Sequence, residues 1–128
     1  MISVSFAELI HKTSIEEFGG LKGIRDPGSL DSALKRPFAT FDSIDLYPTA
    51  IEKAAALLES AVINHPFFDG NKRTAYLLMK YLLFKNGILL EASNIQKYEM
   101  VIKASTGEMG FEEIKHWLLS HTKNSNRS

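Results

Sequence analysis

Apolar residues recur at helical spacing close to the start of the chain. Phe6, Leu9 and Ile10 fall on one face, which predicts a helix over residues 5–17. The pair of glycines that follows this segment, at positions 19 and 20, predicts where the helix ends.

Two stronger helical patterns occupy the middle of the chain. Residues 49–64 carry a wide apolar stripe and predict a helix that begins beside Pro48. Residues 71–86 predict a second helix, with Gly87 placed to cap its C-terminus. Apolar residues leave this second helix little polar surface, so we expect it to lie at the centre of the fold.

The segment between the first helix and these two has a different character. Residues 21–30 contain two glycines and the run Asp26-Pro27-Gly28, which is typical of a turn flanked by short extended pieces. We therefore expect a small β-hairpin there. Residues 29–36 predict a short helix that stops before Pro37.

The last third of the chain predicts two further helices. Ser93 and Gln96 have the spacing of a capping box, which favours a helix over residues 94–104. Phe111, Ile114 and Trp117 mark a final amphipathic helix.

These patterns together predict the fold class and the domain organisation. No alternation of strands and helices indicates a parallel sheet, so we expect an all-α protein, a compact helical bundle with one small hairpin. We predict a single domain over residues 1–121, and a disordered polar tail over residues 122–128.

Composition and charge exclude several classes of protein. Lysine and arginine total 15 and aspartate and glutamate total 15 in 128 residues, so the net charge favours neither a nucleic-acid partner nor a membrane surface. The absence of cysteine excludes disulfides and thiolate metal sites. No run approaches the roughly 20 apolar residues that span a bilayer, and no secretory signal is evident. We therefore expect a soluble, cytoplasmic protein.

Candidate chemistry is concentrated in the run HPFFDGNKRTA at residues 65–75, between the two central helices. Gly70 allows a backbone to approach an anion, and the free N–H groups of the following helix start favour phosphate oxygens. Lys72 and Arg73 add two positive charges beside them. The run therefore predicts a site for a phosphorylated ligand.

Two further residues of this run complete the parts that phosphoryl or nucleotidyl transfer requires. Asp69 supplies an oxygen ligand of the kind that Mg²⁺ takes alongside substrate phosphates. His65 can accept a proton near neutral pH. Base, metal carboxylate, anion site and cations thus lie within nine residues of one another.

Taken singly, each of these residues has a commoner structural interpretation. A histidine before proline often ends a helix, Asp69-Gly70 is a frequent turn pair, and basic residues in a first helical turn are usually solvated. Phe67 and Phe68 are more typical of core anchors than of ligand contacts. The convergence of all these residue types in one short segment favours the functional interpretation.

The run also resembles a family signature. HPFFDGNKRTA is similar to the Fic motif HPFx(D/E)GN followed by a basic residue, and more narrowly to the death-on-curing form HxFxDGNKRTA. The segments GIRDPGSLDSALKRP, DLYPT and EKAAALLESAVINHPF resemble the same branch at matching places, so the similarity extends over residues 4–120.

The resemblance implies a role for each matching position. His65 would be the general base, and Asp69 would hold Mg²⁺ on the nucleotide phosphates. The residues implied to contact ATP are Phe67, Gly70, Asn71, Lys72 and Arg73. Lys72 and Arg73 would also act in catalysis. Segment 21–30 would be the flap that holds a target peptide as an added strand.

Two departures from the adenylylating Fic pattern bear on the reaction. Lys72 and Tyr76 stand where those enzymes usually carry a glycine and a second arginine. The lysine is typical of the death-on-curing branch, in which the γ-phosphate of ATP is transferred instead of AMP. The resemblance thus implies a protein kinase toxin acting on a hydroxyl of the translation machinery, with elongation factor Tu as the suggested target.

Two other functions stay open at the level of sequence. One is an adenylyltransferase, and the other is a catalytically silent module of the same fold that binds a partner or a nucleotide. The resemblance further implies a small antitoxin as a protein partner.

Overall fold

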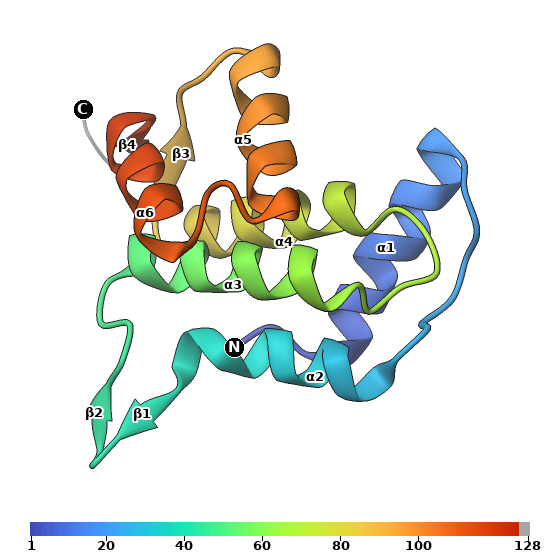
Figure 1. Ribbon diagram of the computed structural model, residues 1–128, viewed down its shortest axis with the longest axis horizontal. Coiled ribbons are helices and arrows are strands. Elements are labelled where there is room, and N and C mark those ends of the chain that lie inside the picture. The colour runs from blue at the N-terminus through green and yellow to red at the C-terminus, as the bar shows by residue number, and fades with distance from the viewer. Residues whose placement is uncertain (126–128) are drawn as a thin grey trace.

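Six α-helices and four short strands form the part of the chain that the computed structural model describes, residues 1–125. The helices are α1 (Val4–Phe18), α2 (Pro27–Lys35), α3 (Ala50–Asn64), α4 (Asn71–Lys85), α5 (Asn94–Thr106) and α6 (Phe111–Ser120). Helices α3 and α4 lie side by side, with α2 on one side of α3 and α5 and α6 on the other (Figure 1). The expected all-α fold is confirmed, and the site motif lies in the turn between α3 and α4.

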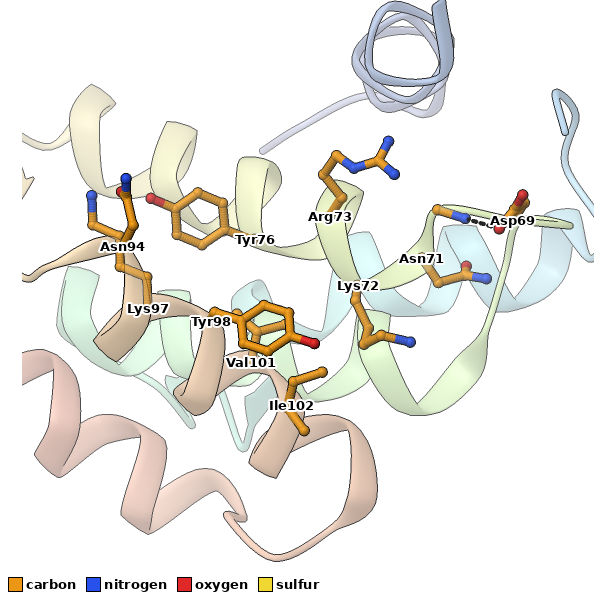
Figure 2. A pocket seen from close by; sticks show the side chains of 11 residues that line it. Asp69, Asn71, Lys72, Arg73, Tyr76, Asn94, Lys97, Tyr98, Val101 and Ile102 are labelled. Carbon is orange, nitrogen blue, oxygen red and sulfur yellow. Dashed lines mark hydrogen bonds between the residues drawn. The ribbon is translucent and has the colours of Figure 1, made fainter. Parts of the chain in front are cut away.

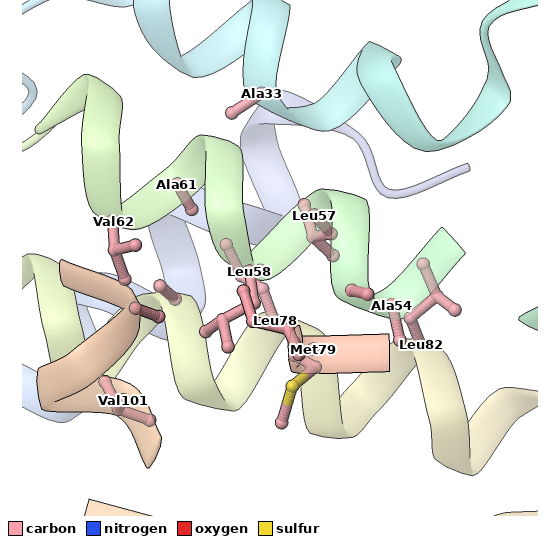
Figure 3. Close-up of a cluster of buried hydrophobic side chains, with 14 of the residues drawn as sticks. Ala33, Ala54, Leu57, Leu58, Ala61, Val62, Leu78, Met79, Leu82 and Val101 are labelled. Carbon is pink, nitrogen blue, oxygen red and sulfur yellow. The ribbon is translucent and has the colours of Figure 1, made fainter. Parts of the chain in front are cut away.

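Helix α3 is more central than α4, which corrects the expectation drawn from the apolar surface of residues 71–86. Eight residues of α3 are buried against six of α4, although both helices have 15 residues. Helix α3 packs against α2, α4, α5 and α6, and many of its buried residues are alanines that allow close approach. Figure 3 shows Leu58 and Leu78 between α3 and α4, with Met79 of the same buried cluster beside them.

The predicted starts of α3 and α5 are confirmed, the start of α5 by the expected capping box and that of α3 by a capping box that the sequence analysis did not single out. The Thr49 side chain accepts from the Glu52 N–H at 3.1 Å, and the Glu52 carboxylate accepts from the Thr49 N–H at 3.1 Å. Ser93 and Gln96 form the same reciprocal pair at the start of α5.

The small hairpin is present, but it lies at a different place from the one expected. Strands β1 (Thr40–Phe41) and β2 (Ile44–Asp45) pair after a short 3₁₀ helix (Arg36–Phe38). The two residues between the strands, Asp42 and Ser43, both have positive φ, as a tight hairpin turn requires.

The expected hairpin near 21–30 is wrong because Asp26 and Pro27 begin a helix there. The Asp26 carboxylate accepts from the Ser29 N–H at 3.1 Å, and Pro27 occupies the first turn of α2. Only a single residue of this segment, Ile24, is bridged to another strand-like residue, Phe67.

The beginning of the expected tail is ordered instead of disordered. Strand β4 (Thr122–Asn124) pairs in antiparallel fashion with β3 (Ile88–Leu90), and the Ser125 N–H donates to the Gly87 carbonyl at 2.7 Å. Residues 126–128 of the expected tail lie outside the described residues. No helix within residues 1–125 combines the length and apolar character needed to cross a bilayer.

Candidate active site

The N-terminus of α4 is open to an incoming anion. Gly70 caps the helix with a left-handed backbone, φ 69° and ψ 21°, and supplies no side chain to its first N–H groups. The first helical bond runs from the Thr74 N–H to the Gly70 carbonyl at 3.0 Å. The N–H groups of residues 71–73 therefore have no acceptor within the helix, and the positive end of the helix dipole lies behind them.

A cavity of about 480 Å³ lies between this helix start and α5 (Figure 2). Its lining from the α4 side is Asp69, Gly70, Asn71, Lys72, Arg73 and Tyr76. Its lining from the α5 side is Asn94, Lys97, Tyr98, Val101 and Ile102. Five of the predicted site residues thus meet at one cavity.

The two basic residues of the motif are held differently. Lys72 is exposed and extends along the cavity, and Tyr98 lies beside it in the close-up view (Figure 2). Arg73 is half-buried, and its Nη1 donates to the carbonyl and the hydroxyl of Ser14 at 3.4 and 3.3 Å. Its guanidinium also lies over the Phe18 ring, 4.9 Å from the centroid. Helix α1 therefore fixes Arg73, whereas Lys72 can follow a ligand.

Two backbone N–H groups hold the Asp69 carboxylate. Oδ2 accepts from the Leu21 N–H at 3.1 Å, and Oδ1 accepts from the Gly70 N–H at 2.9 Å. These bonds, that of Leu21 foremost, lower the pKa of Asp69, and the nearby positive charge of Arg73 adds to the effect. A Cβ on Gly20 would lie 2.7 Å from Oδ2, so only glycine allows the chain to pass this close. The carboxylate is therefore ionised at neutral pH.

Asn71 fastens the motif turn to the helix. Its Oδ1 accepts from the Phe67 N–H at 2.9 Å, and its Nδ2 donates to the Phe67 carbonyl at 2.9 Å. The Phe67 ring is 2% exposed and does not line the cavity. The structure thus gives Phe67 the position of a core anchor.

His65 ends α3 with a left-handed backbone, φ 47° and ψ 58°. Arg25 donates through Nε to the His65 carbonyl at 2.8 Å and through Nη2 to the Asn64 carbonyl at 3.0 Å, which satisfies acceptors at the end of α3. His65 is exposed, and it is not among the residues that line the cavity. The structure therefore gathers residues 69–73 at the cavity and leaves His65 and Phe67 outside its lining.

His11 is a residue of this site that sequence reasoning missed. It is 2% exposed, its Nε2 lies 2.8 Å from the Asp69 carbonyl oxygen, and its ring stacks on Phe67 with the centroids 3.9 Å apart. The signal in the sequence was a pair of polar residues, His11 and Ser14, on the same face of α1 as the buried Ala7 and Ile15. Polar groups on a buried helix face need partners, and both of these find them at the motif.

The segment before α2 lies along the motif turn. The Arg25 N–H donates to the Pro66 carbonyl at 2.8 Å, and the Phe68 N–H donates to the Gly23 carbonyl at 3.3 Å. This arrangement makes Ile24 and Phe67 a pair whose own backbone groups are not bonded to each other. The N–H and carbonyl of Ile24 therefore point away from the motif.

Within residues 1–125, no three histidine, aspartate or glutamate side chains gather as a ready-made metal cage. A single carboxylate suits Mg²⁺, which proteins commonly hold through one or two carboxylates together with substrate phosphates. Each oxygen of Asp69 accepts one N–H bond and keeps a further lone pair. The donor set thus fits a magnesium ion that arrives with a nucleotide.

Comparison with known proteins points to one family. The sequence model of the Fic/DOC family matches residues 2–83, which include α1 to α3 and all but the last two residues of α4, and exclude the α5 side of the cavity. A protein of Mycolicibacterium smegmatis named Toxin Doc is 49% identical over 75 residues, 59% of this chain and 58% of that protein. The alignment thus spans less than two thirds of the length of that relative.

A second relative aligns over nearly the whole chain. A protein of Escherichia phage P1 named Protein kinase doc is 32% identical over 119 residues, 89% of this chain and 90% of that protein. The family match and both relatives lead to the same assignment. The chain belongs to the Fic/DOC family, in its death-on-curing branch.

Proposed function

We propose that the cavity between α4 and α5 binds ATP with Mg²⁺, and that the protein transfers the γ-phosphate to a hydroxyl of a target protein. One observation carries the proposal: the uncapped N-terminus of α4, flanked by Lys72 and Arg73, opens on a cavity of about 480 Å³. Backbone N–H groups, a helix dipole and two cations are what a polyphosphate needs.

The residues of the α4 side divide the binding of the phosphates among them. The N–H groups of residues 71–73 and the fixed Arg73 guanidinium donate hydrogen bonds to phosphate oxygens. The mobile Lys72 ammonium stays in contact with the γ-phosphate during its transfer. Tyr98 offers an exposed aromatic face to the adenine at the other side of the cavity. Asp69 would hold Mg²⁺, which neutralises charge on the phosphates when it is bound.

His65 acts as the general base in this proposal. It accepts the proton of the target hydroxyl while the hydroxyl oxygen forms a bond to the γ-phosphorus, and the bond from that phosphorus to the β-γ bridging oxygen breaks. The products are the phosphorylated target, ADP and a protonated His65, which returns its proton to water. The exposure of His65 supports this role, because a protein substrate approaches from solvent.

The backbone of Ile24 is the proposed docking edge for the target. Its N–H and carbonyl point away from the motif turn and have no partner among the hydrogen bonds of the described residues. An extended peptide added at this edge would lie one strand away from Phe67, and so beside the motif. This keeps the flap role for residues 21–30, although they form no hairpin.

The names of the relatives suggest the biological setting. One is a toxin and the other a protein kinase by name, so we propose a kinase toxin that acts on the translation machinery, with an elongation factor Tu-like target. We further propose that a small antitoxin protein restrains it.

Incubation with candidate translation factors and ATP labelled at either the α- or the γ-phosphate tests the reaction. Transfer of the γ label to a protein supports the kinase. Transfer of the α label identifies an adenylyltransferase, and tight binding without transfer identifies a silent module. Either of the last two results overturns the proposal.

A further inference from the structure

His11 lies beneath the motif turn and is bonded to the main chain of the residue proposed to hold magnesium. Its Nε2 is 2.8 Å from the Asp69 carbonyl oxygen. A carbonyl oxygen only accepts, so Nε2 must carry the proton of this bond. Because the side chain is 2% exposed, water does not compete for this bond.

We propose that His11 is a positioning residue, which holds the Asp69–Gly70 main chain so that the Asp69 carboxylate and the start of α4 face the cavity. The proposal rests on the function proposed above, because it states how that site is kept in working geometry. It assigns His11 no contact with the nucleotide or with the reacting atoms.

The ring of His11 holds the turn in two independent ways. The hydrogen bond fixes the Asp69 carbonyl, and the stacked Phe67 ring, 3.9 Å away at an angle of 4°, fixes the residue two positions earlier. Gly70 lies directly above, because a Cβ added there would be 3.8 Å from Nε2 and 3.0 Å from Cδ1 of Ile15. The motif turn thus packs directly against helix α1.

The position of the Asp69 carboxylate depends on this contact between the turn and α1. Oδ2 accepts from the Leu21 N–H of the segment between α1 and α2, and Oδ1 accepts from the Gly70 N–H of the turn itself, so a shift of the main chain at Asp69 moves the carboxylate relative to Leu21. Misplacement of a reacting group by about 1 Å can lower a rate about 10²-fold. Loss of the His11 donor should therefore lower kcat even where the protein remains folded.

Three substitutions separate the donor from the ring. His11→Phe keeps an aromatic ring for Phe67 and loses the donor, His11→Leu loses both, and His11→Gln keeps an N–H donor at the reach of Nε2. His116→Leu is the matched control, since that histidine is exposed on α6, far from the motif in sequence, and approaches Glu112 of the preceding turn at 3.9 Å. Melting temperatures and the folded fraction are measured for all four variants, and rates are expressed per folded molecule.

We expect kcat for phosphate transfer to fall about 10²-fold in His11→Phe and at least as far in His11→Leu. The KM for the protein substrate should stay close to that of the parent in His11→Phe, because an aromatic ring still packs on Phe67, the bridge partner of Ile24. His11→Gln should recover kcat to within about tenfold of the parent, since one hydrogen bond of similar strength is restored. His116→Leu should match the parent.

Two measurements do not depend on catalysis. Nitrogen-15 spectra of the free protein should show His11 protonated at Nε2, and the amide resonances of Asp69 and Gly70 should move in His11→Phe and return towards the parent in His11→Gln. Calorimetric binding of ATP with Mg²⁺ should weaken in His11→Phe and recover in the same way. These arms decide the proposal even if no phosphate transfer is found in the parent, a result that would count against the proposed function alone.

The outcomes that overturn the proposal are specific. Unchanged kcat in folded His11→Phe, or equal losses of kcat in His11→Gln and His11→Phe, would show that the hydrogen bond from His11 does not position the turn. If the parent transfers no phosphate, unchanged ATP affinity in His11→Phe would likewise show that this hydrogen bond has no positioning role. A loss of folded protein in His11→Leu leaves the comparison of Phe with Gln to decide.

Discussion

The two sides of the cavity are built on different principles. The α4 side carries the motif, and three of its side chains, those of Asp69, Asn71 and Arg73, are held by hydrogen bonds to the segment before α2, to the motif turn itself and to α1. The α5 side presents Tyr98, which is 68% exposed, together with two aliphatic and two polar residues. These are Val101, Ile102, Asn94 and Lys97. The α4 side is arranged to bind an anion of fixed geometry, whereas the α5 side offers an aromatic surface on which a planar group can stack.

This difference suggests a division of labour in recognition. The α4 side, within the residues matched by the family, would set the chemistry at the phosphates. The α5 side, which lies beyond those residues, would determine which group carrying the phosphates, such as a nucleoside, is bound. The two sides can be altered separately, because they come from different helices.

His65→Ala tests a group that belongs to neither side, and it should have the largest effect. Loss of a general base lowers a rate by about 10²–10⁴-fold, whereas ATP affinity should be unchanged because His65 does not line the cavity. Initial rates with γ-labelled ATP, calorimetry with ATP and a melting curve check this. A variant that transfers phosphate as fast as the parent would exclude His65 from the mechanism.

Lys72→Gly tests the α4 side and should have the next largest effect. Removal of one cation from the transferred group should lower transfer by about 10²–10³-fold. ATP binding should weaken less, because Arg73 and the N–H groups of α4 remain. No gain of AMP transfer is expected, since Tyr76 stands where the adenylylating enzymes carry an arginine.

Two controls accompany this substitution. Lys72→Ala separates loss of charge from the added freedom of a glycine, and Lys80→Ala removes an exposed lysine of the same helix that does not line the cavity. Full activity in Lys72→Gly would mean that this lysine is a solvated surface charge, and the assignment as a kinase would lose its main support in the sequence.

Tyr98→Ala tests the α5 side and should act on binding more than on rate. Stacking of a base on an aromatic ring contributes about 1–3 kcal/mol, so the affinity for ATP should fall by about 5- to 150-fold. Binding of inorganic tripolyphosphate should not change, because it lacks the base. Ile95→Ala, on the same helix, exposed and outside the cavity lining, is the control. Equal losses for ATP and tripolyphosphate would show that the two sides are not separate.

Asp69 gives the smallest effect, a pH dependence of stability. Its folded-state pKa lies below the ordinary value because the N–H groups of Leu21 and Gly70 bond to the carboxylate. The resulting stabilisation is complete above the unfolded pKa of about 3.9 and disappears as the pH falls through the lower folded value.

The melting temperature therefore should differ more between the parent and Asp69→Asn at pH 6 than at pH 2.5. The difference should be small, since the carboxylate is exposed. Asp42→Asn, in the turn of the β1–β2 hairpin, serves as the control. A difference that does not vary with pH would mean that these N–H bonds contribute nothing measurable.

Helices were predictable where the signal is local. The capping boxes at Thr49 and Ser93 and the apolar stripes of α3 and α4 depend on residues within a few positions of one another, and these elements lie where the sequence placed them. The start of α2 was also a local signal. Asp26-Pro27 reads equally as a turn and as a cap followed by a first-turn proline, and the second reading holds.

Features that depend on distant partners were not predictable. Strand β4 exists because β3, more than thirty residues earlier, offers it an edge, and a polar sequence carries no sign of this. The α5 side of the cavity has no motif, and His11 becomes part of the site only because α1 packs under the motif turn. Residues 69–73 were found because one short segment contains both the turn and the helix start that use them.

The left-handed backbone at His65 has a consequence for how this sequence responds to selection. A side chain in that conformation costs about 1–2 kcal/mol, which glycine would avoid. Directed evolution for thermal tolerance alone should therefore favour glycine at this position and yield a sturdier protein without the proposed base. If His65 is the base, as proposed above, a chain that carries histidine there trades stability for chemistry, and the sequence with the highest melting temperature would differ from the sequence with the highest rate.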